Sequence, residues 1–456
     1  MRPFSLDELA ALVGGRRLGA AARFAGAAID SRRIAPGELF AALPGARADG
    51  HDFLPAAAAA GAAAALVSRP VEADLPQLQV DDVAAALAAM AAANRGEFRA
   101  PLVGITGSCG KTTVKGMLEA VLRRQGPTLA TAGNLNNELG VPLTLLRLAP
   151  EHAFAVIEMG ARSRGHIAYL CSLALPTVSV LLNAMEAHLE VFGSVDDVAQ
   201  GKGEIYDRLG PGGVAVVNAD QVYSDAWRRR AERTGATVLT FGVAGDADFR
   251  ASAVALRGDA GSAFTLHTPA GAAAVELALP GGHNVVNALA AAAAAHACGL
   301  APAQIAAGLG DAGAVAGRLA RHRGRGGATV IDDCYNANPG SVRAAVDLLA
   351  GCSGPTVLVL GAMLELGDAS DAFHGEIGKR ARERGIDRLV GVGEALRPAL
   401  AAFGPGGRWY ATREEAAAAV DDWASAASTI LVKGSRSAGM EAVLAALLPP
   451  EDAPCS

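Results

Sequence analysis

The stretch Gly104-Ile-Thr-Gly-Ser-Cys-Gly-Lys-Thr-Thr113 overlaps the end of an apolar run, residues 101–105, and leads into residues 114–122, whose apolar positions recur at helical spacing. This order predicts a buried strand, a turn and the start of a helix. Backbone N–H groups and the dipole at a helix N-terminus favour an anion. Lys111 can reach the β- and γ-phosphates of a nucleotide, and a threonine hydroxyl can ligate Mg²⁺. We therefore predict ATP binding here rather than a glycine-rich turn with an incidental lysine.

Composition limits the classes of protein to consider. The chain has 456 residues, of which 51% are hydrophobic and only 4% aromatic, so we expect two to four domains with cores of small and aliphatic side chains. The net charge is −6 and no basic block occurs, which gives no support for nucleic-acid binding.

Neither a membrane nor a secretory route is indicated. No apolar run reaches membrane-spanning length, and the N-terminus lacks the apolar core of a signal peptide. Free thiols in a reducing compartment best explain scattered cysteines without metal-ligand spacing. We expect a cytoplasmic protein, a monomer by default, with six unpaired cysteines at positions 109, 171, 298, 334, 352 and 455.

The pattern of elements predicts an α/β chain of three domains. Residues 1–99 form a small N-terminal α/β domain. Residues 100–314 form a central P-loop ATPase domain, with a parallel sheet and an antiparallel meander at 247–279. Residues 315–456 form a C-terminal Rossmann-like, doubly wound domain. The segment Arg318–Gly327, rich in Arg and Gly, is interpreted as a linker or hinge.

Polar residues at the ends of predicted central strands are candidates for chemistry, because ligands collect there in open parallel sheets. Glu158 suits an Mg²⁺ between phosphates, or it caps the following helix. His188 follows the next predicted strand, but a lone histidine is more often structural than functional. Lys202 and Glu204 lie in a predicted helix, and the default interpretation is that they form a solvated charged pair. In the N-terminal domain, the cluster Asp30–Arg33 with Asp49 and His51 either binds a ligand or forms solvated turns, and the residues alone favour turns.

Seven runs together resemble the Mur ligases, in order and over nearly the whole chain. They are Gly107-Ser-Cys-Gly-Lys-Thr-Thr113, Asn134-Leu-Asn-Asn137, Glu158-Met-Gly-Ala161, Glu186-Ala-His-Leu-Glu190, Gly281-Gly-His-Asn284, Tyr335-Asn-Ala-Asn-Pro339 and Lys433-Gly-Ser-Arg436. The last two runs, with Asp30-Ser-Arg32 and Gly50-His-Asp-Phe53, resemble the branch of the family that adds D-alanyl-D-alanine. The Asp-Asn-Pro-Arg run of the diaminopimelate-adding branch is absent.

The resemblance implies ATP-dependent amide bond formation. A carboxylate of UDP-N-acetylmuramoyl-tripeptide would be phosphorylated, and the amine of D-alanyl-D-alanine would attack the acyl phosphate, giving a peptidoglycan precursor for the cell wall. Such chemistry needs charge neutralisation and positioning more than covalent help. One rival is another amide ligase of this superfamily, diaminopimelate- or lysine-adding or of folylpolyglutamate type. A rival of another class is a nucleotide switch without ligase activity.

By the same resemblance, roles fall on particular residues. Lys111 and the loop amides would hold the γ-phosphoryl group, with Thr112 and Glu158 on a first Mg²⁺. His188 would help to hold a second Mg²⁺, and Lys202 matches a lysine that can carry a carbamate. Nucleotide binding would use Gly107, Ser108, Cys109, Gly110, Lys111, Thr112, Thr113, Asn284, Arg318 and Asp333, with Asn287 as a further candidate near the adenine. Substrate binding would use Ser31 and Arg32 for the uridine nucleotide, and Asn336, Asn338, Lys433 and Arg436 for the dipeptide.

Four positions depart from the family pattern. Cys109 and Cys334 stand where serine is common, Met185 replaces a small residue, and Ala362 stands where we expect an aspartate. None of these changes removes an expected metal or phosphate ligand.

Overall fold

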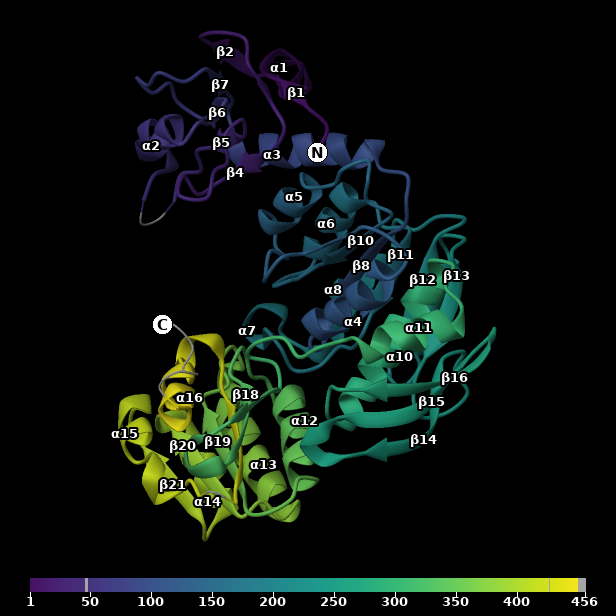
Figure 1. Cartoon of the computed structure of the whole chain (residues 1–456), viewed down its shortest axis with the longest axis vertical. Helices are drawn as coiled ribbons and strands as arrows, with labels where there is room; N and C mark the ends of the chain where they lie inside the picture. The colour runs from purple at the N-terminus through teal and green to yellow at the C-terminus, as the bar shows by residue number, and fades with distance from the viewer. Residues whose placement is uncertain (46–47, 426, 450–456) are drawn as a thin grey trace.

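The computed structural model describes residues 1–45, 48–425 and 427–449. It contains three domains, each built on its own sheet, arranged along an arc in Figure 1. The N-terminal domain lies at the top of this view, the central domain at the right, and the C-terminal domain at the lower left. This architecture confirms the predicted three-domain α/β fold.

The N-terminal domain has a five-stranded sheet in the order β2-β7-β6-β5-β4, with β1 and β3 paired beside it. Strands β4 to β7 pair in parallel and β2 is antiparallel. Ser5 opens the first helix, because its side chain accepts a hydrogen bond from the Glu8 N–H. The elements are β1 Phe4–Ser5, α1 Leu6–Val13, β2 Arg16–Leu18, β3 Arg23–Phe24, β4 Ala27–Ala28, β5 Leu39–Ala41, α2 Leu54–Ala59, β6 Ala64–Val67, β7 Gln77–Gln79 and α3 Val83–Glu97.

The central domain has a six-stranded parallel sheet in the order β13-β12-β11-β8-β10-β9. Strand β8, which precedes the glycine-rich loop, lies inside the sheet, so the loop emerges at the middle of its carboxyl edge. The strands are β8 Leu102–Thr106, β9 Thr128–Ala130, β10 Phe154–Glu158, β11 Val178–Leu181, β12 Val214–Asn218 and β13 Thr237–Phe241. The helices are α4 Lys111–Arg123, α5 Gly140–Leu145, α6 His166–Ala174, α7 Leu189–Phe192, α8 Val195–Gly203, α9 Ser224–Glu232, α10 Gly282–Ala297 and α11 Pro302–Gly310.

The predicted meander is an antiparallel sheet, β14 Arg250–Leu256, β15 Ser262–Thr268 and β16 Gly271–Leu277. Helix α10 packs between this sheet and the parallel sheet, and every residue from Ala288 to Ala295 is fully buried. Small side chains allow the helix to approach both layers closely, which explains why so alanine-rich a segment is a core helix.

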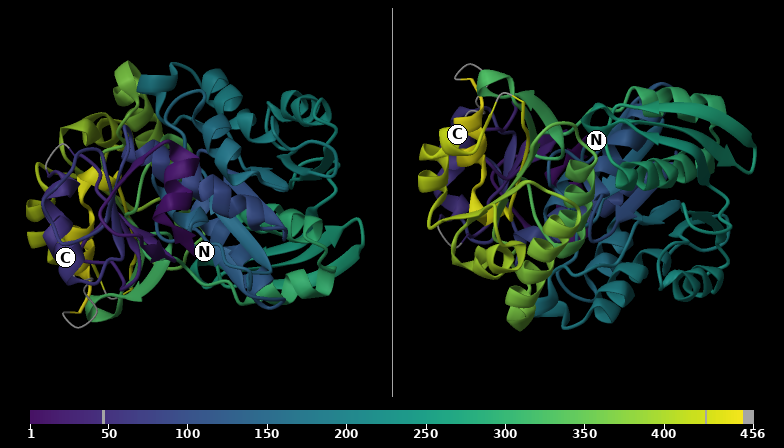
Figure 2. Two further views of the ribbon diagram at one scale, coloured as in Figure 1. Left: turned by 90° about the horizontal axis from the view of Figure 1, so that it is seen from above. Right: turned by 90° about the horizontal axis from the view of Figure 1, so that it is seen from below.

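The C-terminal domain has a sheet in the order β17-β18-β22-β19-β20-β21, parallel except for β17. It lies beside the central domain in both views of Figure 2. The strands are β17 Ala320–Arg323, β18 Thr329–Asp333, β19 Thr356–Gly361, β20 Arg388–Val392, β21 Gly407–Tyr410 and β22 Thr429–Lys433. The helices are α12 Pro339–Ala350, α13 Ser370–Glu383, α14 Arg397–Phe403, α15 Arg413–Ala418 and α16 Glu441–Leu447.

One interpretation from the sequence is wrong. The segment Arg318–Gly327 is not simply a linker, because it contains the edge strand β17. Arg321 and Arg323 point to solvent from this strand, and Arg321 Nε lies 2.7 Å from the Asp259 carboxylate of the central domain. Charged residues are common on edge strands because they discourage pairing with other chains. The arginines therefore removed the apolar pattern by which a strand is predicted from sequence.

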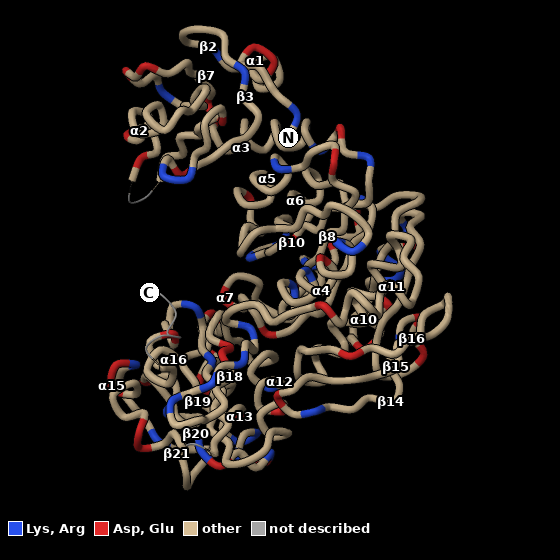
Figure 3. Tube along the Cα trace, viewed as in Figure 1, with Lys and Arg blue, Asp and Glu red and all other residues tan. Residues whose placement is uncertain are grey.

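Two further observations concern surface and thiols. In the described part of the chain, no helix is both long and apolar enough to cross a membrane. Acidic and basic residues are interspersed along the trace (Figure 3). The described cysteines, at 109, 171, 298, 334 and 352, are free thiols, and Cys455 lies outside the described residues.

Candidate active site

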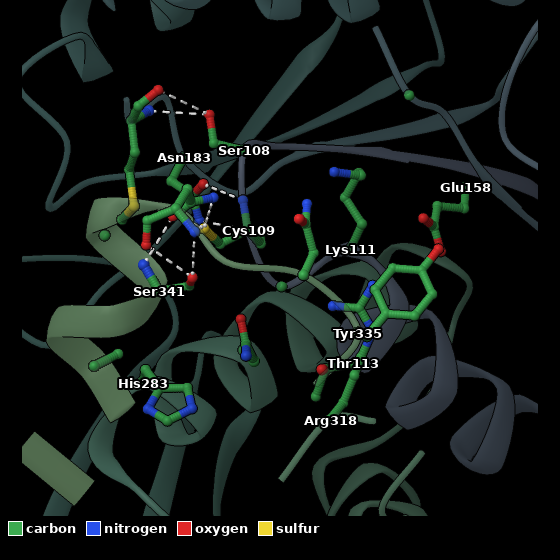
Figure 4. Close-up of a pocket in the computed structure, with 18 of the residues that line it drawn as sticks. Ser108, Cys109, Lys111, Thr113, Glu158, Asn183, His283, Arg318, Tyr335 and Ser341 are labelled. Carbon is green, nitrogen blue, oxygen red and sulfur yellow. Dashed lines mark hydrogen bonds between the residues drawn. The ribbon is translucent and has the colours of Figure 1, made fainter. Parts of the chain in front are cut away.

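A cavity of about 640 Å³ lies between the central and C-terminal domains, at the carboxyl ends of their parallel strands (Figure 4). It gathers most of the residues that the sequence marks as functional. Those lining it are Ser108, Cys109, Gly110, Lys111, Thr113, Glu158, His188, Lys202, Asn284, Asn287, Arg318, Asp333, Asn336, Asn338 and Lys433.

The glycine-rich loop is shaped by its last glycine. Gly110 has φ +83° immediately before α4, and a Cβ there would lie 2.6 Å from Oδ1 of Asn287. Only glycine adopts this conformation without strain while leaving room for the amide. Lys111 Nζ donates to the Gly107 carbonyl 2.7 Å away, and burial lowers the pKa of Lys111. A lysine amine at a loop that leads into a helix N-terminus suits a phosphate chain.

Asn183, directly after β11, fixes the tip of the loop. The Cys109 N–H donates to Asn183 Oδ1 at 2.9 Å, and the Ser108 N–H donates to the Asn183 carbonyl at 3.1 Å. The Ser108 hydroxyl in turn accepts the Met185 N–H at 3.0 Å. The loop conformation is therefore set by the neighbouring strand end.

Glu158 ends β10 and is 1% exposed. Its Oε2 accepts a hydrogen bond from the Thr112 hydroxyl at 3.0 Å, and Oε1 accepts one from Asn136 Nδ2 at 2.8 Å. Glu158 does not cap the following helix, since the N–H groups of Gly165 and Ala168 donate to Glu204 instead. A hydroxyl beside a carboxylate is an oxygen donor set that suits Mg²⁺.

Lys202 is not a solvated surface lysine. Its side chain is 2% exposed, and burial, with the nearby charge of Lys111, lowers its pKa to about 7. Its expected partner Glu204 is engaged with backbone N–H groups, as described above. The cavity wall therefore contains a lysine amine that is partly unprotonated near neutral pH.

His188 lies at the start of α7 in the left-handed backbone region, with φ +56°. Its Nδ1 is hydrogen-bonded to the Glu365 carboxylate of the C-terminal domain. Burial lowers the pKa of His188, against the opposing effect of Glu365. Among the described residues, no group of three His, Cys, Asp or Glu side chains converges as a metal site, so a metal near His188 needs further oxygen donors.

The C-terminal domain contributes cationic and aromatic side chains to the cavity wall. The Arg318 guanidinium lies 4.2 Å from the centroid of the Tyr335 ring, and both point into the cavity (Figure 4). Lys433 Nζ is 2.5 Å from Asp333 Oδ2 and 3.0 Å from the Asn336 carbonyl. Asp333 and Lys433, expected at the ribose and the dipeptide, are thus paired with each other.

Some predicted residues lie outside this cavity lining. Thr112 stands behind it against Glu158, and Gly107 contributes its carbonyl to Lys111. Arg436 is exposed and paired with Glu441 at 2.9 Å. Ser31 and Arg32 lie in the N-terminal domain between β4 and β5, where Arg32 pairs with Asp30 at 2.8 Å.

Sequence reasoning gave no role to several residues that shape the site. They include Asn136, Asn183, His283, Tyr335, Arg343 and Glu365. Three of them, Asn136, His283 and Tyr335, stand inside runs that were already singled out, and that position was the available signal. Burial lowers the pKa of His283 to about 4. Glu365 lies in the loop after β19, three residues beyond Ala362, and Arg343 lies within α12; neither was given a role.

Comparison with protein-family models divides the chain into three matched segments. The model described as "Mur ligase family, catalytic domain" matches residues 23–95. "Mur ligase middle domain" matches residues 105–295, and "Mur ligase, glutamate ligase domain" matches residues 317–436. The first segment lies in the N-terminal domain, and the other two lie on the two sides of the cavity.

Individual proteins match along almost the full length. The chain is 44% identical over 450 residues to UDP-N-acetylmuramoyl-tripeptide--D-alanyl-D-alanine ligase of Escherichia coli (strain K12), covering 97% of this chain and 98% of that protein. The crystal structure of MurF from Acinetobacter baumannii has a TM-score of 0.90 at 36% identity, covering 97% and 98% of the two chains. MurF ligase from Thermotoga maritima in complex with ADP has a TM-score of 0.80 at 29% identity, covering 92% and 96%.

Proposed function

The chain belongs to the Mur ligase family, and from that membership we propose how its residues perform the reaction. It is an ATP-dependent ligase that joins D-alanyl-D-alanine to UDP-N-acetylmuramoyl-tripeptide in peptidoglycan synthesis. The alternatives, a diaminopimelate- or lysine-adding ligase or a ligase of folylpolyglutamate type, are not favoured by relatives that match almost the whole of this chain. The ADP complex of the Thermotoga maritima protein supports ATP as the nucleotide.

The observation that carries the mechanism is one cavity with a phosphate loop on one wall and an Arg–Tyr pair on the other. In our proposal Lys111 and the N–H groups of the loop neutralise the γ-phosphoryl group as it moves to the substrate carboxylate. Arg318 adds charge from the facing domain. The dipeptide amine then attacks the carbonyl carbon of the acyl phosphate and the C–N bond forms. The C–O bond to phosphate breaks, phosphate leaves with its electron pair, and the nitrogen loses a proton to solvent.

We propose two Mg²⁺ sites, and the residues present fit them unequally. Thr112 and Glu158 supply oxygen ligands without change, and their 3.0 Å contact already brings them together. His188 and Lys202 supply only nitrogen, and in our proposal a carbamate on Lys202 would add oxygen ligands for the second ion. When bound, the ions would offset the negative charge of the phosphates and the carboxylate.

Substrates would occupy both ends of the cavity and the N-terminal domain. We propose that Asn284 and Asn287 lie near the adenine and Asp333 near the ribose, after Lys433 has released it. Asn336, Asn338, Lys433 and Arg436 would face the dipeptide, and Ser31 and Arg32 the uridine nucleotide. Residues 1–99, 100–314 and 315–456 would be the three functional units, in a cytoplasmic monomer.

An isotope experiment tests the acyl phosphate. UDP-N-acetylmuramoyl-tripeptide labelled with ¹⁸O in its terminal carboxylate is incubated with ATP, Mg²⁺ and D-alanyl-D-alanine. We expect one ¹⁸O atom in the released phosphate, because that oxygen bridges carbon and phosphorus in the intermediate. Unlabelled phosphate accompanying the pentapeptide product would contradict this mechanism.

A further inference from the structure

The hydrogen bond between His188 and Glu365 crosses from the central to the C-terminal domain. Glu365 lies between β19 and α13, and helix α7, which begins directly after His188, lies beside the C-terminal domain in Figure 1. The His188 side chain lines the cavity, whereas Glu365 is not among the described residues that line it. Glu365 therefore contacts the imidazole ring from outside the described lining of the cavity.

Both partners hold a strained backbone to make this contact. His188 has φ +56° and Glu365 has φ +64°, the left-handed region that side chains other than glycine rarely adopt. Such strain costs on the order of 1–3 kcal/mol and persists where the surroundings determine it, often at functional sites. Two strained residues from two domains meeting at one hydrogen bond indicate that its geometry matters.

The loop that carries Glu365 is rigidly supported. The Met363 N–H donates to Nε2 of His374 at 3.0 Å, and the Leu364 N–H donates to the Ser435 hydroxyl at 2.9 Å. His374 is fully buried. The Glu365 carboxylate is half exposed, but the backbone just before it is anchored by these two hydrogen bonds.

A second contact holds the same short run of the central domain. Arg343 of α12 lies 3.2 Å from the Glu186 carboxylate and 2.8 Å from the Glu376 carboxylate. Residues 186 and 188 are therefore both held by the C-terminal domain, one through Arg343 and one through Glu365. Only the Glu365 contact involves the imidazole ring.

We propose that Glu365 is a positioning residue that fixes the orientation and tautomer of His188 from the opposite domain. The Glu365 carboxylate accepts the Nδ1 proton, which leaves Nε2 as the unprotonated nitrogen. An imidazole whose other nitrogen donates to a carboxylate is oriented and made more basic toward a metal ion. This inference rests on the proposed function, and it means that the histidine is correctly arranged only when the two domains are docked.

The tautomer can be read directly in the full-length, metal-free protein. Among nine histidines, the ¹⁵N signals of His188 in imidazole-labelled protein are assigned by their loss in His188→Gln. We expect a protonated Nδ1 in the wild type and in Glu365→Gln, whose amide oxygen still accepts. In Glu365→Ala the proton should move to Nε2, and an unchanged Nδ1-protonated tautomer there would overturn the inference.

Arg343→Met is the matched control, because it breaks the contact of the C-terminal domain with Glu186 and leaves Glu365 in place. We expect this variant to keep the wild-type tautomer. If Arg343→Met and Glu365→Ala shift it equally, the Glu365 contact serves only docking and the inference is wrong.

Kinetics give a second readout. We expect Glu365→Ala to lower kcat about 10–100-fold, the usual effect of losing such a partner, with KM for ATP unchanged because the glycine-rich loop is untouched. Glu365→Gln should restore most of kcat. Absence of ligation by the wild type with both substrates would refute the proposed function, whereas the tautomer experiment judges the role of Glu365 independently.

Discussion

At the scale of single residues, burial decides the chemistry of the cavity. Burial lowers the pKa of both Lys111 and Lys202, and the nearby charge of Lys111 lowers that of Lys202 further, to about 7. An amine that is substantially neutral can react with carbon dioxide to form a carbamate and release a proton. This change converts a cation into an oxygen donor for a metal near His188.

Lys202→Ala tests this role. We expect kcat to fall by about 10–100-fold or more, as for other losses around a metal site, and added acetate or formate to restore part of it by occupying the space of the carbamate. Turnover is measured by phosphate release, with circular dichroism as the control for folding. Near-normal turnover without added carboxylate would remove Lys202 from the mechanism.

His283 gives a pH-dependent prediction about stability. Its pKa in the folded chain is about 4, below the ordinary value of 6.5, because burial and then Lys433 disfavour the imidazolium ion. As the pH falls from 7 to 5, the unfolded chain binds a proton at this site and the folded chain does not, so stability falls. The wild type should lose about 1–2 kcal/mol more than His283→Gln over this interval. Equal losses in denaturant unfolding at the two pH values would contradict the assignment.

At the scale of elements, the glycine-rich loop depends on the conformation of one residue. Gly110→Ala would add a Cβ 2.6 Å from Asn287 Oδ1 at φ +83°, which costs on the order of 1–3 kcal/mol. We expect ADP affinity, measured by calorimetry, to fall about tenfold or more.

Gly116→Ala is the matched control within the same helix. A Cβ there meets nothing closer than Val315 Cγ2 at 3.8 Å. It should leave ADP affinity unchanged and stabilise α4 by up to about 1 kcal/mol, since alanine is the better helix former. If Gly110→Ala also binds ADP normally, the loop does not hold the nucleotide in the way described.

The elements also show what the sequence could predict. Strands such as β8, β10 and β18 were predictable because both faces are buried and the apolar runs are continuous. The edge strands β9, β13, β17 and β21 were not, since β17 is rich in arginine and edge strands need no such run. For the site, Lys111 follows from the glycine-rich loop before a helix and Glu158 from its place at a strand end, whereas Lys433 was assigned through the family resemblance. Glu365 and Arg343 could not be predicted, because their roles arise from one domain facing another.

At the scale of the whole molecule, the site exists only where two domains meet. The loop, Glu158 and Lys202 belong to the central domain, whereas Arg318, Tyr335 and Lys433 belong to the C-terminal domain. Each wall alone could bind part of a nucleotide, but neither could bring the charges together around a transferring phosphoryl group. This division suits a reaction in which three substrates must be assembled before chemistry begins.

The most direct test of ligase function is phosphate release by the purified protein with ATP and Mg²⁺, with UDP-N-acetylmuramoyl-tripeptide and D-alanyl-D-alanine supplied singly and together. We predict rapid release only with both substrates, accompanied by a product whose mass is that of the UDP-N-acetylmuramoyl-pentapeptide. Phosphate release that does not depend on D-alanyl-D-alanine would contradict the account. So would a product that forms only when a single amino acid replaces the dipeptide.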